Sequence, residues 1–163
     1  MNAREALKLG VTGGQDIVQR YLADLSDADL LVRAVPNSNH IAWQLGHLIA
    51  AENMMLEAVR PGSMPKLPEG FREKHGKQTA TSDDAKNFLK KDEYLKLLKE
   101  QRAGTMKVLD GLSEADLDGP VPDSLKNFLR NVGDVFSMQG THYVMHAGQW
   151  ALIRRKLGRP PLF

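Results

Sequence analysis

The sequence predicts an all-α fold, a four-helix bundle in a single domain that spans residues 1–163. Four segments carry apolar residues at helical spacing, which is typical of amphipathic helices that pack against one another. Strand signals are nearly absent, because no run of alternating β-branched residues is bounded by turn residues. The length of 163 residues is that of one ordinary domain.

The first helix is expected from about Arg4 to Leu25. Its apolar positions are Leu7, Ile17, Val18, Tyr21, Leu22 and Leu25. Gly10, Gly13 and Gly14 interrupt this pattern, and each lowers the stability of a helix by up to about 1 kcal/mol relative to alanine. The three glycines therefore predict a kink or the close approach of another helix.

The second helix is expected from about His40 to Arg60. It follows a turn (PNSN, 36–39) that is rich in helix-capping residues, and it ends at Pro61 and Gly62. The connection that follows, Pro61–Lys91, contains three prolines and three glycines. Such a long connection is uncommon in a compact domain, and it is usually functional or disordered. We expect it to drape across one end of the bundle and to free the second and third helices from having to be antiparallel.

The third helix is expected from about Asp92 to Leu112, and the fourth from about Asn131 to Leu157. The apolar side of the third helix carries Leu95, Leu98, Met106, Leu109 and Leu112. Asn131 can cap the fourth helix, and Gly158 followed by two prolines ends it.

A short repeat suggests that the chain consists of two helical hairpins of related design. The phrase LSDADL (25–30) recurs as LSEADL (112–117), and each copy leads to a similar turn, VPNS (35–38) and VPDS (121–124). The alternative is that this phrase is a common way to stop one helix and start the next.

Composition and charge exclude several classes of protein. Hydrophobic residues make up 42% and charged residues 26% of the chain, which is typical of a globular protein and not of a disordered one. The net charge is +2 and lysines alternate with acidic residues, so no basic stripe predicts a nucleic-acid partner. No apolar run approaches the ~20 residues that span a bilayer, and Met1–Ile17 lacks the core of a signal peptide. We therefore expect no membrane partner and a cytoplasmic location.

Cysteine is absent, which excludes disulfides, thiolate metal sites and a cysteine nucleophile. Any metal site must therefore use His, Asp or Glu.

His142 and His146 form an H-x-x-x-H pair, which places two imidazoles one turn apart on the same helix face. The pair lies on a stripe of expected buried residues (Val135, Met138, His142, Met145, Gln149 and Leu152). Two buried neutral imidazoles need polar partners, and a shared metal ion would satisfy both.

His47, in the second helix, is the third candidate ligand. It shares a face with Trp43, Ala50 and Met54, and the small residues around it leave space beside the imidazole. Three histidines from two helices would leave a coordination position open for water or substrate, which is typical of catalytic zinc sites. The alternatives are that His47 is a core histidine and that H-x-x-x-H pairs often lie on a surface or bond to the backbone.

Several other residues are expected to have structural roles. His40 lies about 10 Å from His47 along the helix axis, too far to share one metal ion, and can start the helix or support a ligand. We expect His75 to be exposed. The tryptophans at 43 and 150 and the methionines at 54, 55, 138 and 145 are expected to be packing residues.

Two segments, NHIAWQLGHL (39–48) and HYVMHAGQWALIRRKLG (142–158), resemble the signature segments of the DinB/YfiT-like metalloprotein superfamily. The helix order, the proline turn before the second helix and the long middle connection are also similar. The resemblance implies a four-helix bundle with a long crossover between helices 2 and 3. It also implies one divalent metal ion bound through His47, His142 and His146.

The resemblance further implies a metal-dependent enzyme, because characterised relatives include transferases and isomerases that use low-molecular-weight thiols. We expect an S-transferase or a hydrolase with Zn or Ni, although three imidazoles also suit Cu and Fe(II). The partners expected are a small-molecule substrate, a low-molecular-weight thiol and a second copy in a homodimer. The alternative is a non-catalytic, dimerising, stress-related protein that binds metal. A third interpretation, ranked below both, is a purely structural bundle.

No catalytic acid or base is assigned. Tyr143 stands where the peptidase motif H-E-x-x-H has its glutamate, which argues against a peptidase. Gln44, Gln139 and Gln149 can orient ligands or water but cannot take up a proton. Glu52 is a candidate acid-base group, although we expect it to be an exposed partner of a lysine.

Overall fold

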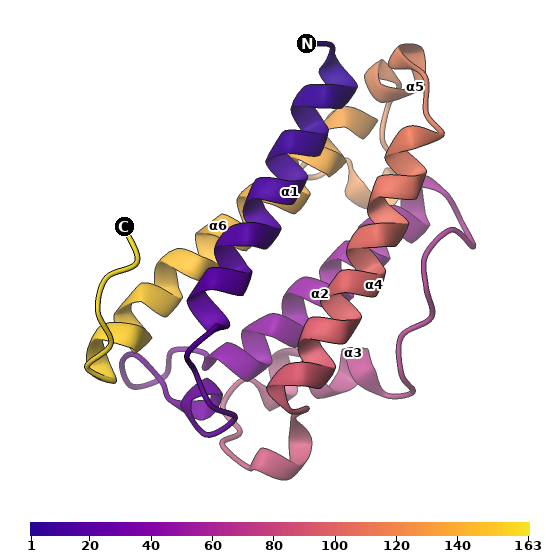
Figure 1. Cartoon of the computed structure of the whole chain (residues 1–163). Coiled ribbons are helices and arrows are strands. Elements are labelled where there is room, and N and C mark those ends of the chain that lie inside the picture. Colours follow the sequence, from indigo (N-terminus) through magenta and orange to yellow (C-terminus); the bar gives the residue numbers. More distant parts are fainter.

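The computed structural model describes residues 1–163 and is all-α, with four long helices packed as a bundle (Figure 1). The long helices are α1 (Ala3–Leu22), α2 (Ile41–Val59), α4 (Lys91–Asp110) and α6 (Val132–Lys156). The predicted fold class is confirmed. The expected ends agree to within three residues, and the largest difference is at the first helix, which ends at Leu22 and not at Leu25.

Short elements join the long helices. They are η1 (Asp29–Leu31), α3 (Phe71–Lys74), η2 (Lys77–Thr79), η3 (Ala85–Asn87), α5 (Glu114–Asp118) and η4 (Asp123–Leu125). Three of them, α3, η2 and η3, lie in the crossover between α2 and α4. None of the helices is both long and apolar enough to cross a membrane.

The four long helices form a ring in which α1 packs on α6, α6 on α2, α2 on α4, and α4 on α1. The crossover leaves one end of α2 and returns to the other end before α4 begins, so α2 and α4 run in the same direction (Figure 1). The expected release from an antiparallel arrangement is therefore observed, and α3 packs against α2 on the way.

The glycines of α1 allow it to approach α6 closely. A Cβ atom on Gly14 would lie 2.8 Å from the carbonyl oxygen of Gly140, and one on Gly140 would lie 2.4 Å from that of Gly10. Gly13, by contrast, has open space at this position. The glycine-containing segment is thus an unbroken helix packed closely on its neighbour, which was one of the two expectations.

A buried polar layer lies between the two apolar clusters of the bundle. One cluster contains Leu45, Tyr143 and Trp150, and the other contains Leu56 and Phe136. The members of the buried polar layer are Glu52, Asn53, Gln101, Arg102, Thr105 and Gln139.

Glu52 is the centre of this layer. Its carboxylate accepts hydrogen bonds from Thr105 Oγ1 at 2.5 Å and from Tyr143 Oη at 2.6 Å. The guanidinium of Arg102 lies 3.5 Å from the same carboxylate. The expectation that Glu52 is exposed and paired with a lysine is therefore wrong, because α4 and α6 cover this face of α2 and supply two hydrogen-bond donors and the guanidinium of an ion pair.

Both copies of the repeated phrase form the same local structure. Ser26 and Asp29 exchange reciprocal hydrogen bonds between side chain and backbone, and Ser113 and Asp116 do the same. Each pair starts a short helical segment that follows a long helix. The repeat thus has a physical basis in two equivalent pairs of hydrogen bonds, and at Ser113 this pair is the capping box of α5.

Candidate metal centre

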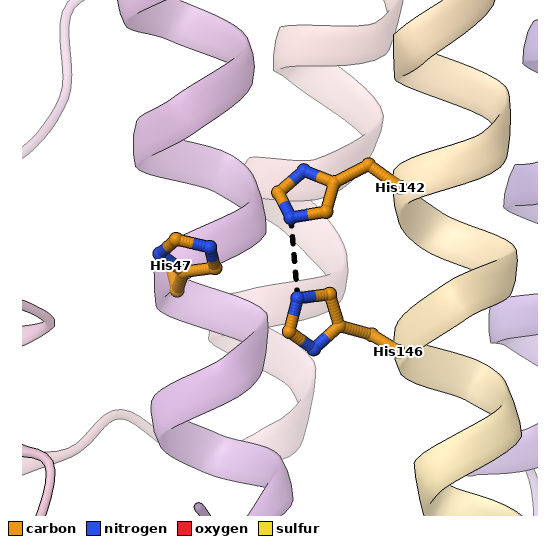
Figure 2. A group of neighbouring side chains, drawn as sticks. All are labelled: His47, His142 and His146. Carbon is orange, nitrogen blue, oxygen red and sulfur yellow. Dashed lines mark hydrogen bonds between the residues drawn. The ribbon is translucent and has the colours of Figure 1, made fainter. Parts of the chain in front are cut away.

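His47 from α2 faces His142 and His146 from α6 across the interface of the two helices (Figure 2). One ring nitrogen of each residue lies within 4.8 Å of those of the other two. No other His, Asp or Glu joins this group. The three residues that the sequence singled out are therefore brought together by the fold.

Two buried polar contacts bracket the histidines and set the register of α2 against α6. On one side, Gln44 of α2 contacts His146 and Trp150 of α6. On the other side, Glu52 of α2 accepts the hydrogen bond of Tyr143. These contacts pair earlier residues of α2 with later residues of α6, so the helices are antiparallel.

Gln44 fixes the tautomer of His146. The indole nitrogen of Trp150 can only donate, so the Gln44 atom that it contacts at 2.8 Å is an acceptor, the amide oxygen. The same oxygen lies 2.7 Å from His146 Nδ1, which must therefore carry the proton of the neutral ring. The amide nitrogen of Gln44 donates to the carbonyl of Asn39 at 2.6 Å. His146 Nε2 is left unprotonated and faces the other two histidines.

The spacing of His142 and His146 fits a divalent metal ion. Their Nε2 atoms are 3.2 Å apart (Figure 2). Two zinc–nitrogen bonds of about 2.0–2.1 Å at the tetrahedral angle separate the nitrogens by roughly 3.4 Å. Because His146 Nε2 carries no proton, the pair is stable when His142 donates a proton to it or when a cation lies between two unprotonated nitrogens. The donor set therefore fits a zinc-like ion.

His47 is oriented in a different way from His146. Its ring stacks on Trp43, with 5.2 Å between the ring centroids and 6° between the planes. The indole nitrogen of Trp43 in turn donates to the carbonyl of Gly76 in the crossover at 3.1 Å. Trp43 was expected to be only a packing residue, and its place one turn before a candidate ligand was the sequence signal for this second role.

Burial keeps the three imidazoles neutral. It lowers the pKa of His142 to about 4 and that of His146 to about 3, and the neighbouring histidines contribute to both shifts. The pKa of His47 is lowered by burial alone. Because metal ions bind unprotonated imidazole, all three rings are in the ligand form at neutral pH.

The remaining histidines lie outside the cluster. His40 Nδ1 caps α2 by accepting from the Trp43 backbone at 3.1 Å, as the helix-start alternative predicted. The expectation that His75 is exposed is wrong, since only 3% of its surface is accessible. Its ring nitrogens lie 2.7 Å from the carbonyl of Phe71 and 2.7 Å from Tyr94 Oη.

The expected buried stripe of α6 is confirmed at Val135, only half-buried at Met138 and His142, and wrong at its other three positions. Met145 and Leu152 are 57% and 52% exposed, and Gln149 is exposed as well. Besides Val135, the buried face contains Phe136, Gln139, Tyr143, His146, Trp150 and Ile153. Several of these buried residues are polar. A prediction from apolar spacing alone therefore placed the buried face of α6 too far round the helix, toward solvent. Met54 of α2, also expected in the core, is 45% exposed.

Of the three glutamines considered, Gln44 alone contacts a candidate ligand. Gln139 lies in the buried polar layer, where its amide nitrogen donates to the carbonyl of Val135 at 3.1 Å. Gln149 is exposed on α6. Of the three, only Gln44 is therefore placed to orient a candidate ligand.

A family model for the DinB superfamily matches residues 12–150, which include all three histidines. The chain belongs to the DinB superfamily. The structure of this DinB-superfamily chain is also similar to the crystal structure of a conserved protein from Enterococcus faecalis, with a TM-score of 0.74 and 15% sequence identity. The similarity covers 98% of this chain and 99% of the other, which shows a shared fold. No curated protein matches the sequence.

Proposed function

We propose that this protein is a metal-dependent enzyme that binds one divalent ion, Zn or Ni, through His47, His142 and His146. The observation that carries the proposal is the convergence of three neutral imidazoles within 4.8 Å, with one tautomer fixed by Gln44. When bound, such an ion supplies a Lewis acid that lowers the pKa of a thiol or water molecule beside it. Because no fourth protein ligand joins the group, a coordination position is left for such a molecule.

The surroundings of the cluster favour a thiol over water as the nucleophile. Glu52, the candidate base on α2, is fully buried and is occupied by two hydrogen bonds and an ion pair, so a substrate cannot reach it. A thiol, with an ordinary pKa of about 8.5, loses its proton far more easily than water, at about 15.7. The chain has no cysteine, so the thiol must be a low-molecular-weight co-substrate. Thiol-dependent group transfer is the reaction that we propose, in a cytoplasmic setting that keeps thiols reduced.

The chain's own residues have positioning roles in this proposal. Gln44 holds His146 with its Nε2 atom toward the cluster, and Trp43 holds the plane of His47. The buried layer around Glu52 fixes the register of the two helices that carry the ligands.

Binding of a thiol can be tested without knowing the second substrate. The protein is loaded with Co(II) and titrated with glutathione or cysteine, and a thiolate-to-metal charge-transfer band is sought in the near ultraviolet. The proposal predicts a saturable band that the His142→Ala variant does not show. A loaded site that gives no band with any thiol, yet hydrolyses esters or amides, would favour a hydrolase.

A second candidate is a non-catalytic, dimerising metal-binding protein. It is favoured by an apolar groove of about 600 Å³ between α1 and α6, beside the exposed side chains of Leu9, Val144 and Met145. A second copy could place its own ridge in this groove, because the same face carries both features. Light scattering on Val144→Glu beside the wild type tests the dimer, and a monomeric wild type would contradict it.

A further inference from the structure

Trp43 lies between the crossover and the candidate metal ligand His47. One face of its indole stacks on the imidazole, and its nitrogen donates to the carbonyl of Gly76. The side chain is only 8% exposed, so both contacts are shielded from water. The indole thus connects a segment of the crossover to a ligand on α2.

The stacking contact substitutes for a hydrogen bond that His47 lacks. Histidines that bind metals usually donate their second ring nitrogen to an acceptor, which fixes the orientation of the ring. His146 has this arrangement through Gln44. Burial is the one cause of the lowered pKa of His47, with no hydrogen bond to its ring among the causes. The ring instead lies flat against Trp43. Trp43 is therefore the residue placed to fix the plane of this imidazole.

A second contact seats the same crossover segment on the turn of α2 that carries His47. The buried ring of His75 lies directly over Gly46, where a Cβ atom would be 1.9 Å from His75 Cδ2. The Oη atom of Tyr94, on α4, lies 2.7 Å from Nε2 of the same ring. A glycine is therefore required at position 46 for His75 to occupy its site.

We propose that Trp43 is the positioning residue for His47 and that it couples metal binding to the order of the crossover segment Phe71–Thr79. This inference rests on the proposed metal site. If the indole must be flat against the imidazole for tight binding, then the carbonyl of Gly76, which holds the indole, contributes to metal affinity. Coupling free energy is reciprocal, so a bound ion must stabilise the crossover segment in turn.

The first test is the zinc affinity of Trp43 variants, measured by competition with a chromophoric chelator. We expect Trp43→Leu, which loses both the stacking and the N–H donor, to bind zinc about 10- to 100-fold more weakly. Trp43→Phe keeps a flat ring and loses one hydrogen bond, so its affinity should fall by about fivefold. Tyr94→Phe changes none of the three candidate ligands, but it removes the contact to His75 Nε2 and should also weaken binding.

Arg33→Gln is the matched control. Arg33 holds the next part of the crossover by donating to the carbonyls of Ala80 and Ser82, at 3.0 Å each. Its loss loosens residues 80–82, and Arg33 takes part in neither the Trp43–Gly76 nor the His75–Gly46 contact. The zinc affinity of this variant should therefore equal that of the wild type.

The second test is limited proteolysis with trypsin, which can cleave at the exposed Lys74 and Lys77. Zinc should slow cleavage at these two sites in the wild type and have no such effect in Trp43→Leu. Should Trp43→Leu fail to fold by circular dichroism, the Trp43→Phe and Tyr94→Phe variants carry both tests.

Unchanged zinc affinity in the folded variants, or cleavage that is insensitive to zinc in a wild type that binds it, would overturn the inference and leave the metal site intact. A wild type that binds no zinc would overturn both the inference and the proposed function.

Discussion

His146 Nδ1 lies 2.7 Å from the amide oxygen of Gln44, and this contact decides which nitrogen of the imidazole faces the other two histidines. The amide cannot be rotated by 180° without placing its NH₂ group against the Trp150 donor. The tautomer of His146, with an unprotonated Nε2 facing the other histidines, is therefore set without a bound ion.

Gln44→Met should weaken zinc binding about 10- to 100-fold, because His146 Nδ1 loses its acceptor and the ring can adopt the other tautomer. Chelator competition measures the affinity. Gln149→Met, an exposed glutamine on α6, is the matched control and should bind like the wild type. Equal affinities for the two variants would show that Gln44 does not orient the ligand.

Glu52→Ala should lower the free energy of unfolding by about 3–5 kcal/mol, because it leaves the buried Arg102 guanidinium without its counter-ion. Urea denaturation measures the change. The exposed Glu100→Ala should alter stability by less than about 0.5 kcal/mol. A similarly small effect at Glu52 would contradict the account of the buried polar layer.

Two glycine substitutions should have opposite signs. Gly140→Ala introduces a Cβ atom 2.4 Å from the carbonyl oxygen of Gly10, so it should force α1 and α6 apart and destabilise by about 1–3 kcal/mol. Gly13→Ala meets open space and should stabilise by up to about 1 kcal/mol. Thermal denaturation measures the stability of both variants. A Gly140→Ala protein as stable as the wild type would contradict the close packing of α1 on α6.

The metal-free protein should lose stability as the pH falls from about 7 to 5. Burial lowers the pKa of all five histidines below the ordinary 6.5, including His142 to about 4 and His146 to about 3. Below pH 6.5 the unfolded chain therefore binds more protons than the folded one, which favours unfolding. The perturbed carboxylates lose their contribution only near and below their ordinary values of 3.8–4.5.

Urea midpoints at pH 7, 6 and 5, measured with a chelator present, test this prediction. A midpoint that stays constant or rises over this range would contradict the burial of the histidines.

The main helices and two of the three clustered histidines could be predicted because their signals are local. Apolar spacing and helix caps located the four helices, and the four-residue spacing of His142 and His146 placed both on one face of one helix. The third candidate ligand, His47, was selected because small residues flank its imidazole on another helix.

The environments of Glu52 and His75 could not be predicted, because their partners are distant in sequence. Glu52 is buried by Thr105 and Tyr143, and His75 by Tyr94 and Gly46. A lone charged or polar residue is usually exposed, and only the packing of separate helices reverses that expectation. Part of the buried face of α6 was misplaced for a related reason. Its polar members Tyr143 and His146 are buried because they contact polar residues of α2.

Metal content tests the central claim most directly. Elemental mass spectrometry is applied to the untagged wild type and to His146→Ala, with His40→Asn as a control that changes a histidine outside the cluster and keeps a capping side chain. The account predicts about one divalent ion per chain in the wild type and in the control, and none in His146→Ala. No bound metal in the wild type after incubation with zinc or nickel, or equal metal in all three proteins, would contradict it.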